Sequence, residues 1–184
     1  FLLNIISPLD GTEVLCDALK QEYDVNLQGV FTLLDVSIPG VDMEPMYQEL
    51  SSNSGEGRAN VLEILDNVLK GEMKTSLLKL LEPTKDNTVE RCESADDTVC
   101  EILEKGATDW VAIGALYAAA HNKFGAAAEF LPRYLTHTNP IVRETALFTY
   151  AKVDRSESFE QMCAELVTDP DPSVSDLAKS LISG

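Results

Sequence analysis

Asn139-Pro140-Ile141-Val142-Arg143-Glu144-Thr145-Ala146-Leu147-Phe148 is the stretch that decides the fold class. Asparagine followed by proline is a typical helix start, because the amide side chain caps free backbone N–H groups and proline suits the first helical position. The small Ala146 then follows the larger apolar Val142 by four residues, which places both on one side of the helix. The stretch therefore predicts a helix that a neighbouring helix can approach closely.

The same arrangement recurs along the chain. Similar stretches begin at Thr108 and Asp171, and residues 58–63 are a degenerate copy. Four sites in these copies are equivalent: Val61, Ala115, Ala146 and Ala178. The steps between them are 54 (115−61), 31 (146−115) and 32 (178−146) residues. A step near 30 is typical of stacked helical hairpins, which present a surface to partners rather than a reaction centre.

Helical periodicity covers nearly the whole chain, and no segment longer than four residues alternates as a half-buried strand would. The sequence therefore predicts an all-α protein. We expect a single repeat domain over residues 1–184, with a long N-terminal capping helix at 12–36, irregular repeats at 43–104 and regular repeats at 108–184.

Individual helices follow from the apolar stripes. In the regular region they are expected at 108–121, 125–136, 139–153, 157–167 and 172–182. On the 139–153 helix, one shared face is expected to hold Ile141, Val142, Thr145, Ala146, Thr149 and Val153. The polar residues 51–57 are expected to form a loop, and 86–97 have no clear pattern.

Charge narrows the classes of partner. The chain has 14 Lys and Arg against 31 Asp and Glu, a net charge of −17. Such a balance repels nucleic-acid phosphates and anionic lipid surfaces, so we expect no nucleic-acid partner. The apolar residues 1–6 are far shorter than the roughly 20 residues of a spanning helix, and no direct membrane insertion is expected. Because the chain begins with Phe1, we interpret it as a fragment of a longer protein.

Residues for catalysis or metal binding are not grouped in the sequence. Cys16, Cys92, Cys100 and Cys163 lack the C-x-x-C spacing of a zinc site, which favours buried thiols in a reducing, cytoplasmic setting. His121 and His137 are sixteen residues apart and form no metal pair. We therefore expect a protein that is not an enzyme and that needs no metal or cofactor.

Trp110 is the candidate site residue. It stands at a predicted helix start, and tryptophan is enriched at the energetic centres of protein interfaces. Trp110 could anchor a protein partner, or it could pack against the preceding hairpin. Both interpretations stay open at this point.

The repeat resembles that of HEAT-like proteins, in which helices open with D/N-P-x-V-R-x-x-A. Arg143 matches the arginine of that pattern, Arg58 matches it less well, and Ala112 and Ser175 hold its place in the other two copies. The resemblance implies a right-handed α-solenoid of HEAT-like helical hairpins. The continuous arginine–aspartate ladder of some family members is not expected here.

A narrower resemblance covers residues 20–153. It rests on Tyr23–Leu27, Val30–Leu34, the stretch RANVLEILDNVL at 58–69, Leu77–Leu81 and Asp109–Val111 with Ala115–Tyr117. These strings look like the HEAT-like region of bacterial membrane proteins whose transporter-like domain is related to ATP:ADP antiporters, often with a cyclic-nucleotide-binding domain. The resemblance implies a non-catalytic cytoplasmic coupling module, tethered to the inner membrane through the parent protein, whose partners are a protein or other domains of the parent chain.

Two alternatives remain for the function. One is a free-standing cytoplasmic HEAT-like scaffold that binds a protein partner. The other is an accessory protein similar to the HEAT-like phycobilin lyases. Several apolar segments of about 20 residues ahead of Phe1 would favour the membrane protein over the scaffold, and chromophore transfer to a partner cysteine would favour the lyase.

Overall fold

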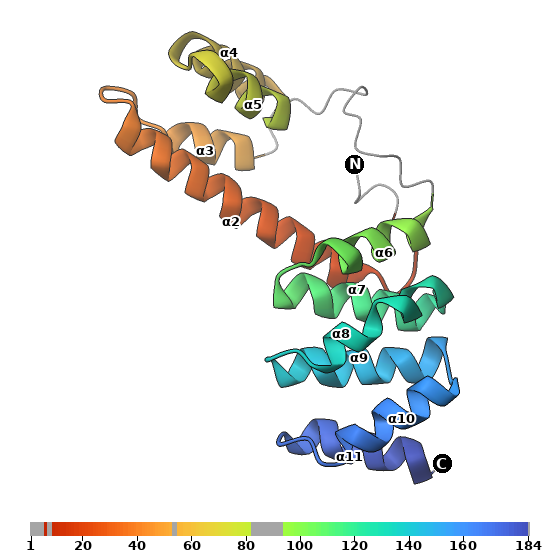
Figure 1. Ribbon diagram of the computed structural model, residues 1–184. Coiled ribbons are helices and arrows are strands. Elements are labelled where there is room, and N and C mark those ends of the chain that lie inside the picture. Colours follow the sequence, from red (N-terminus) through yellow and green to blue (C-terminus); the bar gives the residue numbers. More distant parts are fainter. Residues whose placement is uncertain (1–5, 7–8, 53–54, 82–93, 184) are drawn as a thin grey trace. The chain divides into compact units, whose positions relative to one another are not determined.

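Helices account for every regular element in residues 6, 9–52, 55–81 and 94–183, which are the residues that the computed structural model describes (Figure 1). No strand occurs in these ranges, and the predicted all-α class is confirmed. The chain divides into two compact units, one formed by Phe1–Lys20 with Arg91–Gly184 and the other by Gln21–Glu90. The expected single domain over residues 1–184 stays a prediction.

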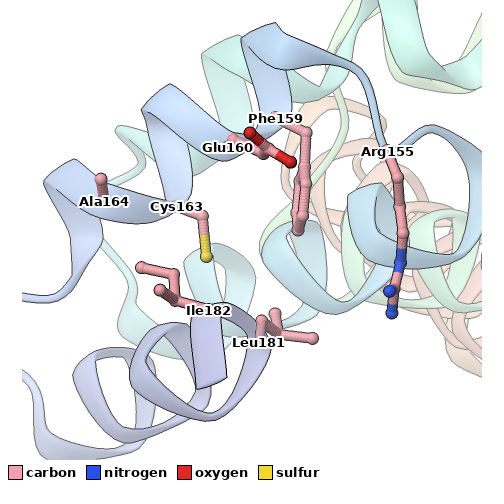
Figure 2. Close-up of a pocket in the computed structure, with 7 residues that line it drawn as sticks. All are labelled: Arg155, Phe159, Glu160, Cys163, Ala164, Leu181 and Ile182. Atoms are coloured by element: carbon pink, nitrogen blue, oxygen red, sulfur yellow. The ribbon is translucent and has the colours of Figure 1, made fainter. Parts of the chain in front are cut away.

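The larger unit is built from helices that pack in sequence order. Its elements are the first residues of α2 (Glu13–Ser37), α6 (Ala95–Lys105), α7 (Asp109–Asn122), the 3₁₀ helix η1 (Gly125–Glu129), α8 (Leu131–Leu135), α9 (Pro140–Val153), α10 (Glu157–Leu166) and α11 (Pro172–Ser183). α7 packs against α9 and α9 against α11, while α6, α8 and α10 lie against α7, α9 and α11 in turn (Figure 1). A groove opens between α10 and α11 (Figure 2).

Small residues and side-chain caps produce this packing. Ala146 is fully buried, as predicted, and the buried Thr149 hydroxyl on the same helix donates a hydrogen bond of 3.0 Å to the Leu116 carbonyl of α7. Gly114 lets α2 approach α7, because a Cβ at this position would lie 2.7 Å from Cα of Leu15. The predicted cap is also present, since Oδ1 of Asn139 accepts a hydrogen bond of 3.0 Å from the Ile141 N–H.

The prediction of one helix over 125–136 is wrong. The segment holds the 3₁₀ helix η1 and then the short α8, which has a proline in its first turn. Pro132 has no N–H to donate to the preceding turn, so one α-helix cannot continue through this position without losing a backbone hydrogen bond. The other helices of the regular region begin and end within two residues of their predicted bounds.

The smaller unit packs the rest of α2 with α3 (Glu44–Ser51), α4 (Gly55–Val68) and α5 (Gly71–Leu81). Its buried apolar residues include Leu27, Phe31, Met43, Leu65, Leu77 and Leu81. Arg58 of α4 donates a hydrogen bond to the Leu81 carbonyl at the end of α5. The predicted loop over 51–57 is too long, because α3 ends at Ser51 and α4 begins at Gly55. Most of the unpatterned 86–97 segment, residues 86–93, lies outside the described residues.

Candidate partner-binding surface

Trp110 lies in the first turn of α7 and is 52% exposed. Packing within the chain therefore covers only about half of this residue. The remaining surface is open to a partner, and Trp110 stays a candidate binding residue.

Three further large apolar side chains are exposed at related positions. Tyr117 is two turns after Trp110 on α7, which places both on one side of the helix. The 31-residue step takes Trp110 to Ile141 (110+31) and Tyr117 to Phe148 (117+31) on α9. The exposed fractions are 41% for Tyr117, 54% for Ile141 and 37% for Phe148. Because α7 packs against α9, we describe Trp110, Tyr117, Ile141 and Phe148 as one surface, the α7–α9 ridge.

The face that the 139–153 helix was expected to share is buried only in part, and Ile141 lies outside the buried part. Val142, Ala146 and Thr149 are fully buried, and Thr149 reaches the α7 backbone from that face. Ile141 is rotated by about 100° from Val142 around the helix, which takes it past the edge of the contact. The apolar stripe of α9 is thus narrower than the sequence suggested.

Two side chains with nitrogen groups, Lys152 and His121, lie beside the aromatic rings of the ridge. Lys152 Nζ lies 5.4 Å from the centroid of the Phe148 ring, and the ring of His121 lies 6.2 Å from that of Tyr117. At the other end, Oδ2 of Asp109 accepts a hydrogen bond of 2.7 Å from Nδ2 of Asn139 and so links the starts of α7 and α9. In a chain of net charge −17, Lys152 places a positive charge beside this aromatic surface.

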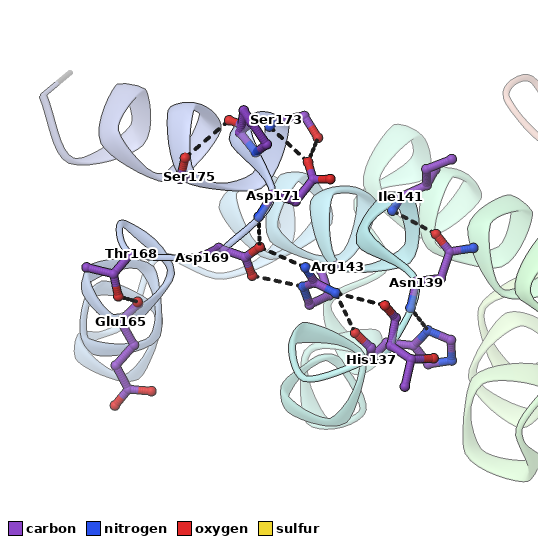
Figure 3. A network of polar contacts seen from close by, with 12 residues as sticks. His137, Asn139, Ile141, Arg143, Glu165, Thr168, Asp169, Asp171, Ser173 and Ser175 are labelled. Carbon is purple, nitrogen blue, oxygen red and sulfur yellow. Dashed lines mark hydrogen bonds and ion pairs between the residues drawn. The ribbon is translucent and has the colours of Figure 1, made fainter.

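An arginine network fixes the start of α9 (Figure 3). Nε and Nη2 of Arg143 donate to the Asp169 carboxylate at 2.9 and 2.7 Å. Nη1 donates to the carbonyls of His137 and Thr138 at 2.8 and 3.1 Å. These bonds tie the turn before α9 to the turn before α11. The hydrogen bond from Arg143 is the main cause that lowers the pKa of Asp169, and the same bond raises the pKa of Arg143.

The arginine network at the start of α9 is not repeated at the starts of α7 and α11. Ala112 and Ser175 hold the positions equivalent to Arg143, and neither has a guanidinium that could reach the next turn. These two residues are the reason why a continuous arginine–aspartate ladder is not expected from the sequence. Of the two helices of the ridge, α9 is held at its start by this network, whereas α7 has Ala112 at the equivalent position.

Catalytic and metal-binding groups are dispersed over the described residues. No set of three His, Cys, Asp or Glu side chains in those ranges is arranged to hold a metal ion. Nδ1 of His137 accepts a hydrogen bond from the Asn139 N–H at 3.1 Å. Burial raises the pKa of the Cys163 thiol. Burial, followed by the charge of Asp96, raises the pKa of Cys100 to about 12, so both thiols stay protonated and weakly nucleophilic near neutral pH.

Comparisons with protein families, curated proteins and solved structures give no match for this chain. In the part of the chain that the structure describes, none of the helices combines the length and the apolar character needed to cross a bilayer.

The sequence analysis identified Trp110 but missed the rest of the ridge. The signal was present, because the repeat step that relates Ala115 to Ala146 also relates Trp110 to Ile141 and Tyr117 to Phe148. The small buried residues are therefore not the only ones that follow the step. Exposed large apolar residues that recur at the 31-residue step on α7 and α9 define this surface.

Proposed function

We propose that this chain is a non-catalytic protein-interaction module that binds a protein through the α7–α9 ridge. The observation that carries the proposal is the exposure of four large apolar side chains at repeat-equivalent positions on two helices in contact. Aromatic side chains bury a large area on binding and dominate interface energies. Lys152 adds a cation that favours a partner with acidic side chains next to its apolar ones.

A finer proposal concerns the parent protein. The helices form a right-handed HEAT-like α-solenoid, and the chain is the cytoplasmic coupling region of a transporter-like membrane protein, held at the inner membrane by the parent. This proposal is supported by the 31- and 32-residue steps, by the capped Asn139-Pro140 start with Arg143, and by the strings over residues 20–153. The ridge then contacts either another domain of the parent or a separate protein.

Site-specific photo-crosslinking in cells tests the proposed function. A benzophenone amino acid replaces Trp110 in the full-length protein, and the matched control replaces Glu129, an exposed residue of η1. We expect a discrete adduct from position 110 that is missing from position 129 and that weakens when Phe148 is changed to serine. Equal adducts from both positions, or none from position 110, would reject the ridge as a binding surface.

Fractionation of the same cells tests the finer proposal. The full-length protein is expected to sediment with membranes, and mass spectrometry of the adduct identifies the contacted polypeptide as the parent chain or a separate protein. A parent found entirely in the supernatant would reject the transporter-like protein and leave the free-standing scaffold as the better account.

A further inference from the structure

The groove between α10 and α11 is a second unfilled apolar surface, separate from the ridge (Figure 2). Its apolar lining comes from Phe159, Cys163 and Ala164 of α10 and from Leu181 and Ile182 of α11. Its volume is about 410 Å³. Phe159 and Cys163 form a buried floor, whereas Ala164 and Ile182 are exposed at the walls. The groove can therefore take up apolar side chains without a rearrangement of its floor.

The repeat register indicates what kind of element fits there. Tyr150 of α9 is only 4% exposed, because Phe159 of α10 packs edge-on against it with ring centroids 5.3 Å apart. The 32-residue step takes Tyr150 to Ile182 on α11 (150+32), and Ile182 is 55% exposed. The same register position is thus covered by a helix in one hairpin and open in the next.

Two charged residues, Arg155 and Glu160, also line the groove. Arg155 donates from Nε to the Ala151 carbonyl at 3.1 Å. No carboxylate of the described ranges forms an ion pair with its guanidinium, and no cation there pairs with Glu160. Figure 2 shows Arg155 at one side of the apolar lining. An incoming element with a carboxylate at that side would gain a charge-assisted hydrogen bond.

We propose that the groove binds one amphipathic helix of a partner protein, seated on α11 as α10 is seated on α9. The helix inserts a large apolar side chain, aromatic by analogy with Phe159, against Ile182, and it places an acidic side chain on Arg155. A helix fits better than a small ligand, because in the preceding hairpin the equivalent position is occupied by a helix, α10, which contacts both α9 and α11. An enclosed ligand pocket would cover most of its ligand, whereas here exposed residues form both walls.

A synthetic peptide of residues 156–168, with Cys163→Ser to prevent disulfide formation, is the probe. It reproduces α10, the helix that covers the equivalent position on α9. Fluorescence polarisation with the full chain is expected to give saturable binding. Ile182→Asp on α11 and Ala164→Glu on α10 should each weaken it at least about tenfold, the factor that corresponds to roughly 1.4 kcal/mol. Arg155→Gln should weaken binding and reduce its dependence on salt.

The controls separate this groove from the ridge. Ile141→Asp makes the same change at an equally exposed isoleucine of the ridge, and it should leave peptide binding unchanged. A peptide with Phe159→Ser or with a scrambled sequence should fail to bind. Equal binding of the scrambled peptide, or no binding of the parent peptide, would overturn the proposal while leaving the crosslink at Trp110 unaffected. Self-association of the chain that is abolished by Ile182→Asp would assign the groove to a second copy instead.

Discussion

Changing Asp169 to asparagine tests whether the Arg143 network stabilises the larger unit. The two side chains are 11% and 6% exposed, the lowest exposures of any ion pair in the described residues. The carboxylate accepts two hydrogen bonds from Arg143 and one of 2.8 Å from the Asp171 N–H. Asparagine keeps one acceptor oxygen but has no charge, so the variant loses one charge-assisted bond and weakens another.

The expected loss follows from these contacts. Hydrogen bonds to charged groups contribute about 1.5 kcal/mol or more each. The carbonyls of His137 and Thr138 continue to accept from Arg143, which keeps the cost below that of a guanidinium left without partners. The free energy of unfolding should fall by about 2–3 kcal/mol, and the melting temperature by roughly 4–12 °C for a chain of this size.

The measurement is urea and thermal unfolding followed by circular dichroism, and Asp176→Asn is the matched control. Asp176 accepts from Lys179 at 2.9 Å, but the side chains are 74% and 54% exposed, so its loss should cost less than about 0.5 kcal/mol. If the two variants unfold alike, the pair contributes nothing special and the reasoning from burial is wrong.

The pH dependence provides a second check. The pKa of Asp169 is lowered in the folded chain, so the unfolded chain binds this proton more readily. The stabilisation is fully present above the unfolded pKa of about 3.9, and it disappears as the pH falls through the lower folded value. The difference between wild type and Asp169→Asn should therefore shrink below about pH 4. A difference that persists unchanged into strong acid would contradict the assignment to the ionised carboxylate.

Two further predictions concern packing and thiol chemistry. Gly114→Ala should destabilise the larger unit by about 1–3 kcal/mol, because its Cβ would meet the backbone of Leu15. In the control Gly125→Ala the added Cβ meets nothing within 4 Å, so this variant should be neutral or slightly stabilising. Urea unfolding measures both variants, and the opposite order of stability would refute the close approach at Gly114. Cys100, whose pKa is raised to about 12, should alkylate very slowly at pH 8.5, and Asp96→Asn should speed the reaction because the Asp96 charge is the second cause after burial. Peptide mapping of the labelled cysteine measures this, and an unchanged rate in Asp96→Asn would show that Asp96 has no influence.

Much of the regular region could be predicted because its signals are local. Asn139 and Pro140 define a helix start through their own chemistry, and the fully buried Ala146 follows from the size of its side chain in a helix contact. The 125–136 segment failed because its apolar stripe suggested one helix while Pro132 broke it from within. The sequence also did not show how wide the buried part of the apolar stripe on α9 is, as the exposed Ile141 illustrates. Whether a residue at the stripe's edge is covered depends on how the neighbouring helix crosses.

The groove and the arginine network depend on pairing between distant segments. Arg143 could be recognised from its motif, but its partner Asp169 lies 26 residues later in a turn, and several acids in that region were equally plausible partners. Likewise, Phe159 and Ile182 become neighbours only through the packing of α10 on α11. The 31- and 32-residue steps relate each position to its equivalent in the next hairpin, so the surroundings of the two positions can be compared.

The same step also sets the limits of the proposed surfaces. Continuing the ridge from α9 to α11 leads from Ile141 to Ser173 (141+32) and from Phe148 to Ser180 (148+32). Both serines are exposed, and Ser173 donates its hydroxyl to Asp171, so the ridge becomes polar at α11. A partner of the ridge therefore gains apolar contacts from α7 and α9 alone. On α11 the exposed large apolar side chain is Ile182, which lines the groove beside α10, so the ridge and the groove are separate surfaces.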